Sequence, residues 1–219
     1  MRKSFGVITR EFDRMEPIDQ FLKNAQDHGH EIHSVIIAYK DRCDFEVVRE
    51  LEKMVKVYVI KVFDCRDDLC IELTELGLAL EHADHLLNCS GKKGTENVPY
   101  GINRNHVVMK AMMTGTDVLY FIDTDVYPRV LIREEGQIVE KEVDFVGEHL
   151  KYLNQENVYI TTSDYTGYYI IPRMKFQGME ALFKGLQKES CYEYITNSYR
   201  HNCLKLEDFS KRETFETNK

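Results

Sequence analysis

Residues 117–128 read Asp-Val-Leu-Tyr-Phe-Ile-Asp-Thr-Asp-Val-Tyr-Pro. The five apolar residues from Val118 to Ile122 are rich in β-branched and aromatic side chains, a composition typical of a strand buried on both faces. The run stops at Asp123, and a second carboxylate, Asp125, follows two residues later. Two carboxylates at the end of a buried strand lose solvation, so a divalent cation or a cationic neighbour would stabilise them. The sequence therefore predicts a ligand-binding strand end, with a plain acidic turn as the alternative.

A helix bounded by glycines is predicted just upstream, over residues 101–115. Its apolar residues at helical spacing are Val107, Val108, Ala111 and Met112. Arg104 and Asn105 stand at its amino-terminal end, so the guanidinium and the two carboxylates face one cleft if the helix lies against the sheet. Arginine is a planar fork for phosphate, a helix start offers backbone N–H groups, and carboxylates hold Mg²⁺ or Mn²⁺. This combination suits a phosphate-bearing substrate with a metal.

The order of these features resembles a known family. Gly101-x-x-Arg104-Asn105, an alanine six residues after the Asn, a glycine, and a hydrophobic strand ending Asp123-x-Asp125 resemble nucleotide-sugar glycosyltransferases of the GT-A fold. The resemblance extends over about residues 3–172, and its specific part is 101–125. The sequence departs from the common pattern after the Asp-x-Asp, where Val126 replaces the usual acidic residue.

The resemblance implies a fold, an activity and roles for four residues. The fold would be a single α/β, Rossmann-like domain whose mostly parallel central sheet is flanked by helices. The activity would be transfer of a sugar from a nucleotide-diphosphate sugar donor to an unknown acceptor, with Mn²⁺ or Mg²⁺. Asp125 would bind the metal directly, and Asp123 would contact the ribose or the metal. Gly101 and Arg104 would contact the donor, Arg104 at its phosphates.

Alternating strands and helices precede the helix at 101–115. Strands are predicted over residues 4–9, 32–39 and 55–63, and helices over 17–28, 45–54 and 67–87. This alternation predicts right-handed crossovers and a largely parallel sheet. The strand ends then bring Thr9, Arg10, Asp41 and Asp64 to one edge, and the resemblance assigns them to the nucleotide's base and ribose. Polar residues are common at strand ends, so the residues alone indicate this weakly.

The second half of the chain would form the acceptor side. We expect residues 1–128 to be the nucleotide-sugar half, 129–204 the acceptor half, and 205–219 a polar tail. Two short β pieces around 130–139, a helix over 143–153, and two β runs within 158–171 are predicted. By resemblance, Asp164 is the candidate catalytic base and His201 a further metal ligand. The alternatives are a turn residue for Asp164 and a solvated tail residue for His201.

Composition excludes several partners. A chain of 219 residues suits one domain. The net charge is −8 and the sequence has no dense Lys/Arg stripe, which argues against nucleic acid or an anionic membrane as the main partner. Nothing approaches 18 consecutive apolar residues, so no transmembrane segment is expected. The six cysteines form no C-x-x-C pair, which favours free thiols in a reducing cytoplasm. The sequence leaves homo-oligomerisation open, and His28, His30 and His33 are expected to be loop residues and not metal ligands.

Three other classes remain as alternatives. A haloacid-dehalogenase-type phosphatase also uses Asp-x-Asp, but there the motif opens the domain and Gly-Thr follows it. A nucleotidyltransferase is closer in fold, but the sequence has no Gly-rich, Lys-bearing loop after the first strand. A non-catalytic sugar- or nucleotide-binding module would keep the cleft without turnover.

Overall fold

A computed structural model describes residues 1–62, 68–88, 100–134 and 137–163. Asp64, Asp164 and His201 lie outside these residues. The chain divides into two compact units. One comprises Met1–Arg129 and Glu142–Thr161, and the other comprises Val130–Lys141 and Thr162–Lys219. The single domain with two functional halves remains a prediction.

The first unit contains a four-stranded parallel sheet among its described residues. Its elements are β1 (Lys3–Phe12), α1 (Glu16–Asp27), β2 (Ser34–Cys43), α2 (Phe45–Glu52), β3 (Lys56–Lys61), α3 (Asp68–Glu75), α4 (Leu80–Leu87), α5 (Tyr100–Met113), β4 (Val118–Ile122) and α6 (Phe145–Leu153). The strand order is β3-β2-β1-β4, which matches the first four strands of the doubly wound Rossmann order. The prediction of an α/β fold with a mostly parallel sheet is confirmed.

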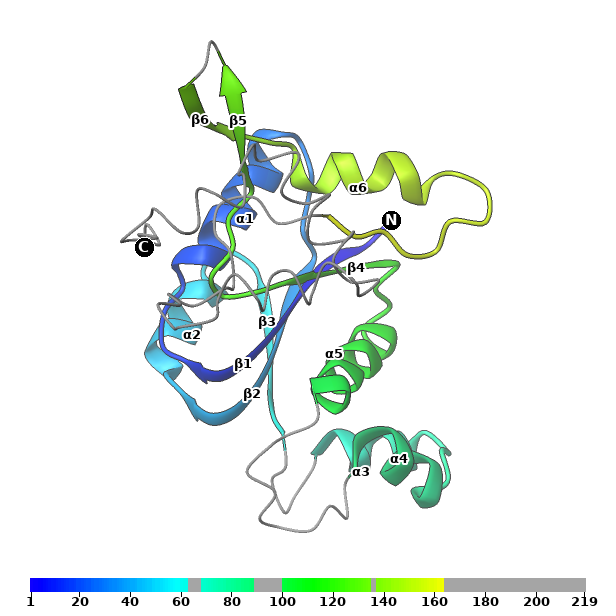
Figure 1. The fold of residues 1–219 in the computed structure, drawn as a ribbon. Helices are drawn as coiled ribbons and strands as arrows, with labels where there is room; N and C mark the ends of the chain where they lie inside the picture. Colours follow the sequence, from blue (N-terminus) through cyan, green and yellow to red (C-terminus); the bar gives the residue numbers. More distant parts are fainter. Residues whose placement is uncertain (63–67, 89–99, 135–136, 164–219) are drawn as a thin grey trace, which may run out of the picture. The chain divides into compact units, whose positions relative to one another are not determined.

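Helices cover both faces of this sheet (Figure 1). On one face, Phe5 and Val7 of β1 pack with apolar residues of α1, α2 and α6. On the other, Ile36 and Ala38 of β2 pack with residues of α3, α4 and α5. Neighbouring residues of each strand therefore enter different cores, which follows from the two-residue period of a strand. Burial on both faces explains why the inner strands read as continuous apolar runs.

Helix α5 runs antiparallel to the strands and places its first turns at the carboxyl edge of the sheet. Its carboxyl end meets the start of β1: the Thr116 hydroxyl lies 2.9 Å from the Ser4 hydroxyl, and the Asp117 amide donates to the Arg2 carbonyl over 2.8 Å. Because its last turn is at the amino edge, its amino-terminal end, with Gly101 and Arg104, is at the opposite edge.

The predicted helix over residues 67–87 is two helices, so that prediction was wrong. Gly77 has φ +97°, a left-handed conformation that glycine adopts without strain, and it follows the end of α3. The Gly77 amide donates to the Thr74 carbonyl, and the Leu78 amide to the Leu73 carbonyl, both over 3.0 Å. These two bonds form a Schellman cap, which ends α3. Leu76 and Leu80, which would lie on the apolar side of one continuous helix, are consequently exposed.

Three further expectations about burial and strands need correction. Only one face of β4 is fully buried: Tyr120 and Ile122 are buried, whereas Leu119 and Phe121 are half-buried beside α5. On α5, Val107 and Ala111 are buried, but Val108 and Met112 are exposed. The β run expected from Val158 is not a strand, because no described strand pairs with it; the Ile160 side chain there is 88% exposed.

The described part of the second unit is built on two strands. Strands β5 (Arg129–Glu134) and β6 (Gln137–Glu142) form a separate two-stranded sheet. The sequence predicted these two strands as short β pieces around residues 130–139.

Candidate functional site

The Asp-x-Asp motif follows β4 at the topological switch point of the described sheet. Strands β2 and β4 lie on opposite sides of β1. In open α/β sheets, ligands bind beyond the carboxyl ends of the strands at such a reversal. The last paired residues of β1 and β4 are Val7 and Ile122, so Asp123 is the first residue after the paired part of β4. Asp123 is half-buried and Asp125 is exposed. The sequence placed this carboxylate pair correctly at a strand end.

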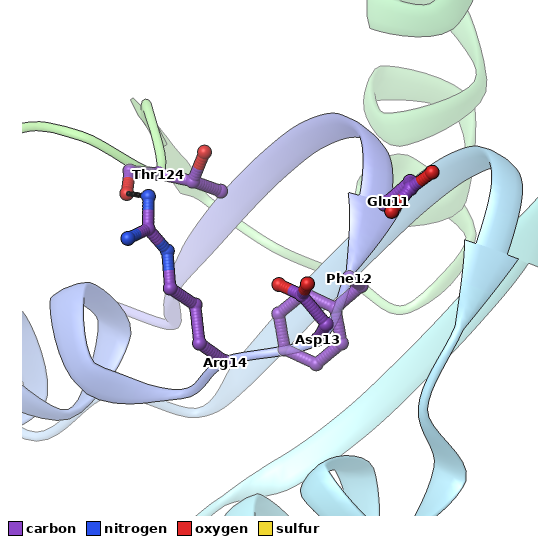
Figure 2. Close-up of a pocket in the computed structure, with 5 residues that line it drawn as sticks. All are labelled: Glu11, Phe12, Asp13, Arg14 and Thr124. Atoms are coloured by element: carbon purple, nitrogen blue, oxygen red, sulfur yellow. Dashed lines mark hydrogen bonds between the residues drawn. The ribbon is translucent and has the colours of Figure 1, made fainter.

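A shallow cavity of about 260 Å³ opens at this edge. The residues that line it are Glu11, Phe12, Asp13, Arg14 and Thr124 (Figure 2). Four of them come from the end of β1 and the loop after it, and the fifth is the central residue of the Asp-x-Asp motif. The Arg14 side chain reaches across, and its Nη2 donates to the Thr124 carbonyl oxygen over 3.3 Å. The cavity therefore lies where β1 and β4 diverge.

The cavity wall carries two carboxylates, those of Glu11 and Asp13. Glu11 and Asp13 each lie 3.6 Å from the Arg42 guanidinium, measured from a carboxylate oxygen to Nη2. All three side chains are about half exposed or more, so these ion pairs are weak and can rearrange when a ligand arrives. Carboxylates of this kind accept hydrogen bonds from ligand hydroxyl and amide groups.

Thr9, Arg10 and Asp41, which the sequence predicted to follow strand ends, lie within β1 and β2. Both strands continue past Thr9 and Asp41, to Phe12 and Cys43, so these residues belong to a paired ribbon and not to loops. Between the pairs Thr9–Tyr39 and Glu11–Arg42, β2 has one more residue than β1, which is a β-bulge. Arg10 and Asp41 pair with each other at this bulge, with Nη2 3.1 Å from Oδ2. The Thr9 hydroxyl donates to the Glu11 carbonyl over 2.7 Å.

Arg104 of α5 lies beside β4, the strand that Asp123 follows. Its guanidinium is 5.2 Å from the centre of the Phe121 ring, a cation–π distance, and Phe121 precedes Asp123 by two residues. Gly101, one turn earlier on α5, is exposed, and a Cβ built there meets no atom within 4 Å. The structure therefore brings Arg104 and the Asp-x-Asp to one edge, as the sequence predicted.

The donor set at the motif suits a hard cation with further ligands from a substrate. Two carboxylates offer oxygen atoms of the kind that Mg²⁺ and Mn²⁺ prefer, and Mg²⁺ sites often use one or two carboxylates with substrate phosphates. No group of three or more potential metal-binding side chains occurs within the described ranges. His201, the third ligand implied by the resemblance, lies outside those ranges.

The histidines near the start of β2 support the fold at the amino edge. His28 Nδ1 lies 2.9 Å from the Asn24 carbonyl oxygen, and His30 Nε2 lies 3.0 Å from an Asp144 carboxylate oxygen. Asp144 also caps α6 by accepting a hydrogen bond from the Gly147 amide. Burial by itself raises the pKa of Asp144. The hydrogen bonds from Gly147 and His30 and the charges of His30 and His28 outweigh this effect and lower the pKa.

Glu11, Asp13 and Arg14 are the cavity residues that the sequence analysis missed. The signal that could have found them is Phe12, an aromatic residue within a polar stretch that is fully buried in the structure. An apolar residue there indicates that β1 runs on and that the following polar residues form the strand-end loop.

Comparison of the chain with family models, with curated proteins and with solved structures gave no match. The fold class therefore rests on the strand order and on the two helical layers. Within the described parts of the chain, no helix is long and apolar enough to cross a membrane.

Proposed function

We propose that this protein is a metal-dependent glycosyltransferase of the GT-A type. It would transfer a sugar from a nucleotide-diphosphate sugar donor to an acceptor that neither its sequence nor its fold identifies. The observation that carries the proposal is the position of Asp123 and Asp125. They follow β4 at the switch point of a parallel sheet, beside a cavity that the end of β1 lines.

Charge and placement support distinct roles for the residues at this edge. Asp125, with Asp123, would hold Mn²⁺ or Mg²⁺, which neutralises the negative charge of a leaving diphosphate when it is bound. Arg104 would bind the donor's phosphates, because a guanidinium offers paired N–H donors to phosphate oxygens. Gly101 leaves open space at the first turn of α5, where backbone N–H groups favour anions.

The β1–β2 ribbon and the loop after it would bind the nucleoside. Glu11 and Asp13 are the cavity carboxylates available to ribose hydroxyl or base N–H groups. Arg10 and Asp41 would contribute only after their mutual ion pair opens. Asp64, which lies outside the described residues, stays a candidate for the same task.

The acceptor side of the proposal rests on residues outside the described ranges. Asp164 is the proposed general base for the acceptor hydroxyl, and His201 the proposed additional metal ligand. Replacing Asp164 with Asn should lower turnover about 10²–10⁴-fold and leave nucleotide affinity unchanged. The cytoplasmic location that the cysteine spacing suggests is likewise a prediction.

A donor-hydrolysis assay tests the proposal. The protein is incubated with a panel of nucleotide-diphosphate sugars, with Mn²⁺ or with a chelator, and release of sugar and nucleotide is measured. We expect release from at least one donor, and only with the metal. Tight nucleotide binding without release from any donor, with or without added acceptor sugars, would favour the non-catalytic binding module. Release of phosphate from simple phosphate esters would favour a phosphatase.

A further inference from the structure

We propose that Arg14 is a positioning residue for the Asp-x-Asp motif. Its hydrogen bond to the Thr124 carbonyl would hold the turn from Asp123 to Val126 against the end of β1, and so fix the separation of the two carboxylates. The inference deepens the proposed function, on which its metal-binding part rests.

The geometry of the turn explains why an outside hydrogen bond is needed. Within it, the Val126 amide lies 3.5 Å from the Asp123 carbonyl oxygen, beyond the usual N–H···O range. The turn's own backbone bond is therefore weak. Arg14, 110 residues earlier in the chain, donates to the carbonyl of Thr124, which lies between the two aspartates. The Arg14 donor is charged, and its 3.3 Å bond adds a restraint from outside to a turn whose own backbone bond is longer.

The base of the Arg14 side chain is itself well anchored. Phe12, two residues earlier, is buried in the core, and its carbonyl accepts a hydrogen bond from the Asp44 amide over 2.7 Å. Pro17 and Ile18, at the start of α1, are buried on the other side. Arg14 thus extends from a loop whose two ends are fixed to the core. Its hydrogen bond to Thr124 therefore holds the Asp-x-Asp turn at a defined position relative to the core.

Position and chemistry distinguish this role from a purely electrostatic one. The contact is directed at a backbone carbonyl, and Figure 2 shows the guanidinium turned toward Thr124 and away from the Asp13 carboxylate. A Lys at position 14 can also donate to a carbonyl, although without the planar fork. Arg14→Lys should therefore retain part of the effect, and Arg14→Ala should lose it.

Hydrogen exchange tests the restraint without any ligand. In the full chain, Arg14→Ala should speed exchange of the Val126 amide, which donates within the turn, about three- to tenfold, the range expected for one lost hydrogen bond. Amides of the buried half of β1 should be unaffected. Arg42→Ala is the matched control, because Arg42 is an arginine of the same edge that pairs with Glu11 and Asp13. Equal exchange in Arg14→Ala and the unaltered protein would overturn the inference.

Titration with Mn²⁺ separates positioning from direct ligand binding. With a nucleoside diphosphate as probe, Arg14→Ala should need about three- to tenfold more Mn²⁺ for half-maximal binding. The nucleotide affinity of Arg14→Ala at saturating Mn²⁺ should stay close to normal. The Mn²⁺ concentration that Arg14→Lys needs for half-maximal binding should lie between those of Arg14→Ala and the unaltered protein. A lost nucleotide affinity with an unchanged Mn²⁺ midpoint would overturn the inference in favour of a ligand-binding Arg14. If the unaltered protein binds no nucleotide, the proposed function fails, whereas the exchange experiment still decides whether Arg14 restrains the turn.

Discussion

Gly6 of β1 lies directly under Val107 of α5, so close that a Cβ on Gly6 would be 2.6 Å from the Val107 Cγ1 atom. Leu119 and Phe121 of β4 also come within 3.3 Å of that point. Glycine at position 6 therefore lets α5 approach the sheet closely. Because Arg104 lies on the same helix, this contact also determines how near its guanidinium comes to the strand that ends in Asp123.

The Gly6–Val107 contact predicts a large effect of a single methyl group. Gly6→Ala should lower the free energy of unfolding by about 1–3 kcal/mol, the usual cost of overpacking a core. Gly101→Ala is the control, because a Cβ there meets no atom within 4 Å; it should be neutral or stabilise α5 by up to about 1 kcal/mol. Urea unfolding measures both. A neutral Gly6→Ala would mean that α5 can shift away from the sheet at little cost.

Arg104 should bind the donor through its shape as well as its charge. Arg104→Lys keeps the charge but loses the bidentate fork, so nucleotide-diphosphate binding should weaken by about 1–3 kcal/mol. Calorimetry in Mn²⁺ measures the change, and urea unfolding checks that the fold is retained. If the variant unfolds more easily yet binds nucleotide normally when folded, Arg104 is a structural residue at the start of α5.

His149 should make stability fall on the acid side of neutrality. Burial lowers its pKa below the ordinary value of 6.5. The folded state therefore disfavours protonated His149, whereas the unfolded chain binds that proton freely. The resulting stability is full above about pH 6.5 and is lost as the pH falls toward the folded-state pKa.

The His149 effect is isolated by comparing variants. Between pH 7.5 and 5, a range that includes the ordinary histidine pKa of about 6.5, stability should fall less in His149→Gln than in the unaltered protein. His85→Gln, at an exposed histidine of α4, is the control for the substitution itself. Urea unfolding at several pH values measures the slopes. Parallel curves for His149→Gln and the unaltered protein would show that protonation of this histidine is not linked to folding.

Local patterns in the sequence were enough to predict the sheet and the motif-bearing strand end. The apolar run before Asp123 and the glycines around α5 each specify their structure over a few residues, and the alternation of elements supplies the parallel order. The helix break at Gly77 was missed because leucines at helical spacing continue on both sides of it. The Schellman cap at Gly77 therefore ends α3 although the helical spacing of the leucines continues.

The details of the site depend on contacts that no local pattern contains. The ribbon past Thr9 forms because β1 and β2 pair with each other there, which the polar residues themselves do not indicate. The ion pair of Arg10 and Asp41 joins residues 31 positions apart, and Arg14 reaches Thr124 over 110. Because of such tertiary contacts, Arg10 and Asp41 pair with each other. Glu11, Asp13 and Arg14 line the cavity instead.

Calorimetric titration of a nucleoside diphosphate, in Mn²⁺ and in a chelator, tests the central claim most directly. If Asp123 and Asp125 form a metal-assisted diphosphate site, the unaltered protein should bind only with Mn²⁺. Asp125→Asn should bind weakly in both conditions, because the amide keeps the size but loses the charge that holds the cation. Equal affinity of the unaltered protein in Mn²⁺ and in chelator, or no binding to any nucleoside diphosphate, would contradict the account.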